Sequence, residues 1–166
     1  MRTQSSARLA VLVSATFVVT GCAAADGADG ATAPPLQLRI VTSSEPGPCT
    51  AAALTADGPG TACGLDGTTT YDLAESLGVV TPISVTRDGQ GAAQTIGVEF
   101  GEADASTLSE VTGDATDEQL ALLLNGEVLT AATVLAPITN GAFSFGFGNA
   151  ADADRVAALL GASSTS

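Results

Sequence analysis

The acidic side chains are the first candidates for chemistry, because the sequence contains no histidine. Without histidine the common general base is missing, and neither a Ser-His-Asp nor a Cys-His arrangement is possible. The five basic residues are all arginine, so lysine-based Schiff-base chemistry and a lysine-dependent phosphate loop are excluded too. Two carboxylate pairs remain, Glu99 with Glu102 and Asp152 with Asp154. Each lies at an expected strand end or in an expected first helical turn, where acids face water or favour the helix dipole. We expect no catalytic residue and no enzyme.

Metal and cofactor sites are not favoured either. Four aspartates lie in glycine-rich segments, namely Asp26, Asp29, Asp57 and Asp66. None of them fits the twelve-residue acidic loop that binds calcium, so we interpret them as solvated loop acids. Two cysteines without histidine would need carboxylates to complete a tetrahedral zinc site. The sequence predicts no metal and no cofactor.

The N-terminus has the features of an export signal. Arg2 and Arg8 flank a short polar start, residues 9–19 form an apolar run, and small residues precede Cys22. A basic start, a short apolar segment and small residues before the cut are typical of a secretory signal. The apolar run is shorter than the roughly 18–20 residues that a membrane-spanning helix needs.

The cysteine that follows the small residues makes this segment resemble a lipobox, the cleavage motif of bacterial lipoproteins. The segment Val19-Thr20-Gly21-Cys22 carries the resemblance. It implies a signal peptide over residues 1–21 and a lipid on Cys22 that anchors the protein to the extracytoplasmic face of the cell membrane. Two acyl chains hold a protein stably, whereas one binds only reversibly. An ordinary secretory signal with an incidental cysteine is the alternative.

Two further cysteines, Cys49 and Cys63, form an even pair. Exported proteins meet an oxidising compartment, so we expect a disulfide between them. The bond would close a segment rich in glycine, proline and alanine that has little else to order it. Two free thiols are the alternative.

The composition limits the possible partners. The formal net charge is −13 and 45% of the residues are hydrophobic. A chain this acidic does not bind nucleic acid through phosphates, which needs a basic patch. An anionic membrane surface would repel it, so the lipid would have to hold it there. The hydrophobic content is nevertheless enough for a folded core, unlike that of a disordered acidic tail.

The first half of the mature chain predicts a tether and several strands. Residues 22–35 are rich in alanine, glycine and aspartate and are expected to form a flexible tether. Residues 36–40 alternate apolar and polar side chains, as in a half-buried strand. We expect a loop over 43–70, strands over 68–73, 83–86 and 95–100, and a turn at 88–91 that joins the last two strands as a hairpin.

The second half predicts two helices and more strands. A short helix is expected over Asp104–Val111 with Asp104 as its N-cap. Asn125-Gly126 predicts a type I′ turn between strands over 119–124 and 127–131. Phe143, Phe145 and Phe147 alternate with small residues after a turn at 140–141 and are expected to fill one face of the core. Three signals predict the closing helix. Its apolar face has helical spacing, its N-cap is Asn149 and its C-terminal glycine is Gly161. The apolar face consists of Ala153, Val156, Ala157 and Leu160.

These elements predict an α+β domain over residues 36–162, with a mostly antiparallel sheet and two helices on one face. Residues 163–166 are expected to be a frayed tail.

The segment 120–160 resembles the head subdomain of the first periplasmic domain of SecD, a membrane subunit of the bacterial protein-export machine. The resemblance is carried by an apolar strand (120–124), the turn Asn125-Gly126, a return strand (127–131), the turn Asn140-Gly141 and a closing helix with Val-Ala-Ala-Leu-Leu (156–160). Upstream, residues 36–40, 63–67 and 71–73 resemble the segments that enter the head. The Ser-Ala-Pro proline of the family is Ala132 here, and its first turn glycine is Asn140.

In this family the head is thought to contact translocating polypeptide. The resemblance therefore implies a non-enzymatic interaction module for exported polypeptides or an envelope partner. Two routes of contact are open, pairing at an exposed strand edge or binding in an apolar groove. A small-molecule-binding lipoprotein and a structural envelope component are the alternatives.

Overall fold

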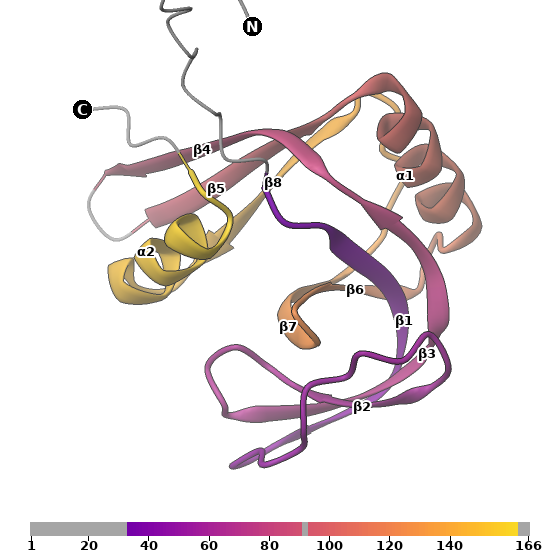
Figure 1. Cartoon of the computed structure of the whole chain (residues 1–166), viewed down its shortest axis with the longest axis vertical. Helices are drawn as coiled ribbons and strands as arrows, with labels where there is room; N and C mark the ends of the chain where they lie inside the picture. Colours follow the sequence, from indigo (N-terminus) through magenta and orange to yellow (C-terminus); the bar gives the residue numbers. More distant parts are fainter. Residues whose placement is uncertain (1–32, 91–92, 163–166) are drawn as a thin grey trace, which may run out of the picture. The chain divides into compact units, whose positions relative to one another are not determined.

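The structure is a computed structural model that describes residues 33–90 and 93–162 (Figure 1). The expected signal peptide (1–21), Cys22, most of the expected tether (22–35) and the expected tail (163–166) lie outside the described residues. The elements in chain order are β1 (Leu36–Pro46), β2 (Gly60–Cys63), β3 (Thr69–Val80), β4 (Pro82–Gln90), β5 (Ala93–Phe100), α1 (Glu102–Asp114), β6 (Gln119–Leu124), β7 (Glu127–Thr133), β8 (Ala142–Phe147) and α2 (Ala150–Leu159).

The described strands form two sheets. One has five strands in the order β2-β3-β1-β6-β7, and the other has three in the order β4-β5-β8. The strand pairs in both sheets are antiparallel, and a single parallel bridge joins Gly64 to Val128. The α+β class with mostly antiparallel strands is therefore confirmed. The strands divide between two sheets, and the helices follow this division, because α1 packs mainly on β3 and α2 packs on β4, β5 and β8.

The main core lies between the sheets and the helices. Strand β6 lies between β1 and β7, and residues 120–124 are all buried because their side chains point alternately into the main core and into a smaller core on the other face of the sheet. A fully buried leucine contributes roughly 1.5–3 kcal/mol relative to an exposed one. The phenylalanine stripe belongs to this core: Phe145 is buried, while Phe143 and Phe147 are half-buried and pack against it. Neighbouring ring centroids in the stripe are 5.9 and 5.6 Å apart.

Both hairpins predicted from turn chemistry are present. Asn125 and Gly126 have φ of 53° and 83°, which is the positive-φ pair that a type I′ turn requires. They join β6 to β7, with Leu124 paired to Glu127. Strands β4 and β5 also pair, but β4 continues to Gln90 and so includes most of the predicted turn at 88–91.

Helix α1 begins earlier than predicted. Its first residue is Glu102 and its N-cap is Gly101, which makes no side-chain hydrogen bond. The assignment of Asp104 as the N-cap was therefore wrong. Its carboxylate instead accepts a 3.1 Å hydrogen bond from the amide of Thr81, at the junction of β3 and β4. Leu108 and Val111 of this helix are buried.

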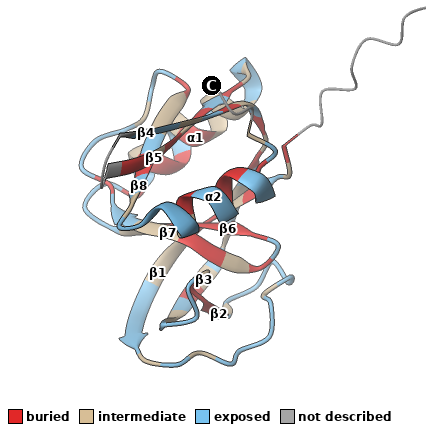
Figure 2. Cartoon of the chain, turned by 90° about the vertical axis from the view of Figure 1, so that its left-hand side faces the viewer, coloured by how far each residue is buried: buried red, intermediate tan, exposed pale blue. Residues whose placement is uncertain are grey.

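Helix α2 matches the predicted signals closely. The side chain of Asn149 accepts a 2.9 Å hydrogen bond from the amide of Asp152, and Gly161 follows the helix with φ of 70°. Ala153, Val156 and Ala157 are buried, and buried and exposed residues lie on different faces of the helix (Figure 2). Neither of the described helices is long and apolar enough to cross a membrane.

The predicted loop over 43–70 was wrong in part. Strand β1 continues to Pro46, and β2 pairs with β3 inside the predicted loop. Strand β3 extends to Val80 rather than ending at Leu73. These residues adopt strand geometry because the neighbouring strands pair with them, and their own propensity for strands is weak.

A second, smaller core lies around Leu73, Leu123 and Val128, and Leu54 of the loop before β2 packs against it. The amide of Leu54 donates a 3.0 Å hydrogen bond to the carbonyl of Gly126. The loop therefore covers a face of the five-stranded sheet that would otherwise be exposed.

Arg39 holds the same loop in place. It occupies a polar position in the alternating pattern of β1, but its side chain is fully buried. The guanidinium donates to the carbonyls of Gly58 and Ala74 at 2.7 and 2.8 Å and also to the carbonyl of Ala56. Burial lowers the pKa of Arg39, and the carboxylate of Asp57 opposes this effect. An arginine in this setting stays charged, so three carbonyl oxygens replace the water that would otherwise solvate this buried cation.

The structure contains the expected disulfide between Cys49 and Cys63, whose Cα atoms are 5.5 Å apart. The bond closes the base of the loop that carries Leu54. In the chain-entropy model a loop of this length is stabilised by roughly 3 kcal/mol.

Candidate functional site

The main candidate site is an apolar groove between β7 and β8. Its volume is about 330 Å³. Its walls come from β1, α1, β6, β7, β8 and the segment after β7, so it lies where the two sheets approach each other. The lining residues are Leu38, Leu108, Thr112, Leu120, Leu122, Thr130, Ala132, Thr133, Val134, Leu135, Ala136, Ile138, Phe143, Ser144 and Phe145.

Hydrogen bonds to α1 and to the start of β6 hold the wall formed by residues 134–138. The amide of Val134 donates to the carbonyl of Glu118 at 2.9 Å. The hydroxyl of Thr112, which is fully buried, accepts from the amide of Ile138 at 2.9 Å and donates to the carbonyl of Leu108 at 2.7 Å. Because this wall is fixed, Leu135 is held at the rim of the groove with 81% of its surface exposed.

Two sheet edges border the groove. β7 is the last strand of the five-stranded sheet and β8 is the last strand of the three-stranded sheet. The edge of β7 is partly occupied, because the amide of Leu65 donates to the carbonyl of Val128 at 2.9 Å. Among the described residues, no strand pairs with the outer edge of β8. An unpaired edge is a template for another extended chain.

A second, smaller hollow of about 120 Å³ lies at the other end of β7. We call it the acidic pocket because two aspartates line it. Thr130 lines both the groove and the acidic pocket, so the two are neighbours along β7. The residues that line the acidic pocket are Gly64, Leu65, Asp66, Tyr71, Val128, Leu129, Thr130, Phe147 and Asp152.

The two acids of this pocket are held in defined positions. The carboxylate of Asp66 accepts from the hydroxyl and the amide of Thr68 at 2.5 and 2.9 Å. These two hydrogen bonds, the hydroxyl first, lower the pKa of Asp66. The carboxylate of Asp152 accepts from the side-chain amide of Asn149 at 2.7 Å.

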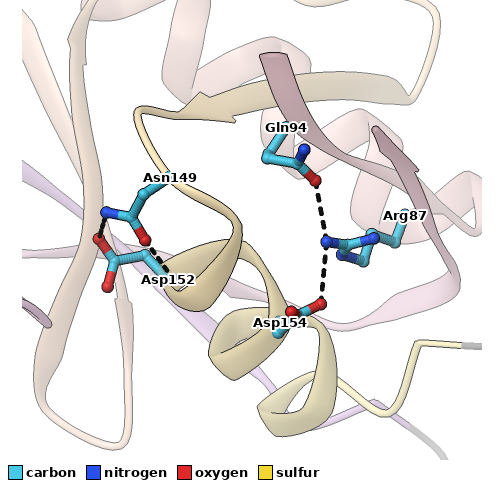
Figure 3. Close-up of polar contacts among 5 residues, drawn as sticks. All are labelled: Arg87, Gln94, Asn149, Asp152 and Asp154. Atoms are coloured by element: carbon cyan, nitrogen blue, oxygen red, sulfur yellow. Dashed lines mark hydrogen bonds and ion pairs between the residues drawn. The ribbon is translucent and has the colours of Figure 1, made fainter. Parts of the chain in front are cut away.

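Figure 3 shows how α2, which carries Asp152, is attached to the three-stranded sheet. Arg87 of β4 forms an ion pair with Asp154 at 2.9 Å and donates to the side chain of Gln94 at 2.8 Å. Asp152 and Asp154, considered above as a carboxylate pair, therefore contact different partners.

The other pair, Glu99 and Glu102, is exposed. Asp57 accepts from the side chain of Gln37 at 3.2 Å, and Asp26, Asp29 and Cys22 lie outside the described residues. No group of three or more histidine, cysteine, aspartate or glutamate residues within ranges 33–90 and 93–162 is arranged to hold a metal ion.

Comparison with known proteins agrees with this architecture. Residues 74–165, more than half of the chain, match the family described as SecDF, P1 head subdomain. The chain belongs to this family. The match begins within β3 and includes the hairpin at Asn125-Gly126, the turn at Asn140-Gly141 and α2, which carried the resemblance in the sequence. It also includes the groove residues other than Leu38.

Solved SecDF structures have a similar fold. One, described as a membrane component that enhances protein export, has a TM-score of 0.52 and 19% identity and covers 80% of this chain and 64% of that chain. SecDF in its super-membrane-facing form has a TM-score of 0.50 and 15% identity and covers 78% of this chain and 18% of that chain. The chain thus spans less than two thirds of either protein. A comparison with curated proteins found no match.

The sequence led us to consider an apolar groove as a route of contact, but it located neither the residues of the groove nor the acidic pocket. The residues of both hollows come from several separate elements, and only the packing of the two sheets brings these residues together. A local signal existed at one position: Leu135 is a large apolar residue between Val134 and Ala136, two residues before Pro137, in a segment with neither helical nor strand periodicity.

Proposed function

We propose that this protein is a non-enzymatic, extracytoplasmic module for protein export that holds extended segments of exported polypeptides in the groove. The observation that carries the proposal is the apolar groove beside the unpaired edge of β8. A peptide strand that adds to such an edge gains main-chain hydrogen bonds, and alternate side chains enter the neighbouring apolar site. Membership of the SecDF P1 head subdomain family supports the link to export.

The edge of β8 is a better docking strand than that of β7. Gly64 and Leu65 already occupy the first part of β7. The Phe143 and Phe145 side chains of β8 line the groove, so a segment paired with β8 would lie beside aromatic surface. Unfolded polypeptides expose apolar side chains and free backbone groups, which are the groups that such a site binds.

Photo-crosslinking from the groove tests this proposal. A photoreactive phenylalanine analogue at Leu135 is expected to crosslink to a defined secretory protein that is kept unfolded by reduction and alkylation. Ile83 is the matched control, because it is 72% exposed and does not line the groove. Equal crosslinking from both positions, or none from Leu135, would argue against binding in the groove.

A small apolar ligand is the second candidate, because the volume of the groove lies at the lower end of the range for ligand pockets. A competition experiment distinguishes the polypeptide from the small ligand. A small ligand that fills the groove is expected to abolish crosslinking of the polypeptide at Leu135. Whichever of the two binds more tightly is then the occupant of the groove. The remaining alternative, a structural envelope component, predicts no binding of either kind.

The proposal includes a lipid anchor on Cys22, which would place the groove near the outer face of the membrane. Mass spectrometry of the N-terminal peptide is expected to find a diacylglyceryl group on Cys22 after removal of residues 1–21. Replacement of Cys22 by serine is expected to release the protein from the membrane fraction. An unmodified N-terminus in the wild-type protein would refute the anchor and leave the groove unaffected.

A further inference from the structure

The acidic pocket extends the groove with a different chemistry. Thr130 of β7 lines both hollows. The groove is lined mostly by apolar side chains, whereas the acidic pocket carries two carboxylates and the rings of Tyr71 and Phe147. An extended chain advances about 3.3 Å per residue and presents every second side chain to the same face. A segment lying along the groove would therefore bring its next side chains to this pocket.

The contents of the pocket suit a cation. Carboxylates form charge-assisted hydrogen bonds with ammonium and guanidinium groups, and aromatic faces attract the same groups. With a volume of about 120 Å³, the pocket fits the head of one side chain rather than a whole ligand. Gly64 keeps the floor open, because a Cβ there would lie 3.1 Å from Oδ1 of Asp66 and 3.4 Å from Cε2 of Tyr71.

No cation of the protein fills this role in the described residues. Arg39 is buried elsewhere and Arg87 is paired with Asp154. Arg155 lies next to the pocket, but its Nη1 donates to the carbonyl of Leu65 at 2.9 Å. Within the described part of the chain, neither Asp66 nor Asp152 forms an ion pair. The lowered pKa of Asp66 keeps its carboxylate charged in mildly acidic conditions.

We propose that the acidic pocket binds a lysine or arginine side chain of the polypeptide held in the groove, so that the site selects segments in which a basic residue follows alternating apolar residues. This inference rests on the proposed function and adds a preference to it. The net charge of −13 favours the same partner at longer range, since opposite charge speeds encounter.

A series of three peptides tests the preference in the wild-type protein. The peptides share an alternating apolar stretch and differ only in the residue two positions after it, which is lysine, glutamine or glutamate. Fluorescence anisotropy measures their binding to the full-length protein in neutral lipid nanodiscs, where no free detergent competes for the groove. The lysine peptide is expected to bind about fivefold more tightly than the glutamine peptide, and the glutamate peptide more weakly than both. High salt is expected to reduce these differences.

Asparagine substitutions assign the preference to the pocket. The double variant D66N/D152N is expected to bind the lysine and glutamine peptides equally, with unchanged affinity for the glutamine peptide. Asparagine keeps one acceptor oxygen, which can still accept from the amide of Thr68 at position 66 and from the side chain of Asn149 at position 152, so the fold is expected to be retained. Asp88→Asn is the control, because Asp88 is exposed on β4 and lines neither hollow.

The possible results separate the two proposals. If the wild-type protein binds the three peptides equally, or if D66N/D152N keeps the full preference for lysine, the cation site is refuted and the proposed function stands. If none of the peptides binds, both proposals fail.

Discussion

Arg39 of β1 donates a 2.8 Å hydrogen bond from Nη1 to the backbone carbonyl of Ala74 in β3. The same guanidinium reaches the carbonyls of Ala56 and Gly58 in the loop, and the side chain is fully buried. One arginine thus joins two strands and the loop that covers the second core. The planar guanidinium is suited to this task because it presents several donors in fixed directions.

We expect Arg39→Met to lower the free energy of unfolding by about 3 kcal/mol, because three backbone carbonyls lose the buried donor that joins them. The free energy of unfolding of Arg39→Lys is expected to lie between those of Arg39→Met and the wild type, since lysine keeps the charge but not the planar set of donors. Urea unfolding followed by circular dichroism measures both. Arg155→Met is the control, because Arg155 is exposed and donates to one carbonyl. An unchanged unfolding midpoint for Arg39→Met would contradict this account.

Substitutions of Gly126 and Gly67 allow the cost of backbone strain to be measured separately from the cost of steric contact. Both have positive φ, 83° and 68°. A Cβ on Gly126 would lie 2.5 Å from the amide nitrogen of Leu54, whereas a Cβ on Gly67 would meet nothing within 4 Å. We expect Gly67→Ala to cost about 1 kcal/mol, the usual cost of the left-handed region. Gly126→Ala is expected to cost about 3 kcal/mol, because the covering loop must also move. Equal costs in urea unfolding would show that the loop does not press on this turn.

Local signals predicted the elements that they encode, and tertiary contacts decided the rest. Asn125-Gly126 requires positive φ at two successive residues, and Asn149 caps α2 through its own side chain. In both cases the interacting groups lie within a few residues of each other along the chain, so the sequence alone was sufficient to predict the turn and the cap. Asp104 carried the same kind of signal but serves a distant partner, the amide of Thr81. A capping residue and a long-range acceptor are indistinguishable in one sequence.

The sites were harder to predict than the elements. The alternation in β1 predicts that Arg39 faces solvent, but the loop folds over it and buries it. That loop is ordered by the disulfide, by Leu54 and by Arg39 itself, so no single segment reveals it. The groove depends on two sheet edges meeting, which is a property of the packing. The cysteine pair could be predicted because export chemistry limits what two cysteines do.

Acid is expected to destabilise the fold through Asp66 and Asp72. Hydrogen bonds from Thr68 lower the pKa of Asp66, and those from Ser43 and then Thr61 lower the pKa of Asp72. A carboxyl with a lowered folded-state pKa stabilises the fold above its unfolded pKa, about 3.9, and loses this effect as the pH falls through the folded value. The free energy of unfolding should therefore decrease as the pH falls from about 5 towards 2.

Urea titrations across this pH range test the assignment. Asp66→Asn is expected to flatten the dependence, whereas Asp88→Asn, on the exposed side of β4, is expected to keep the wild-type slope. If Asp66→Asn follows the wild-type curve throughout, the hydrogen bonds from Thr68 do not stabilise the carboxylate.

Leu135 and Ile83 allow binding and stability to be measured separately. Both are exposed, 81% and 72%, so replacing either with aspartate should change the free energy of unfolding by less than about 0.5 kcal/mol. Leu135 lies at the rim of the groove, and removal of its apolar surface is expected to weaken binding of an unfolded polypeptide about tenfold, as expected for the loss of one leucine side chain. Ile83→Asp should bind as the wild type does. If the two variants weaken binding equally, general surface hydrophobicity rather than the groove holds the polypeptide. If neither does, the polypeptide binds elsewhere.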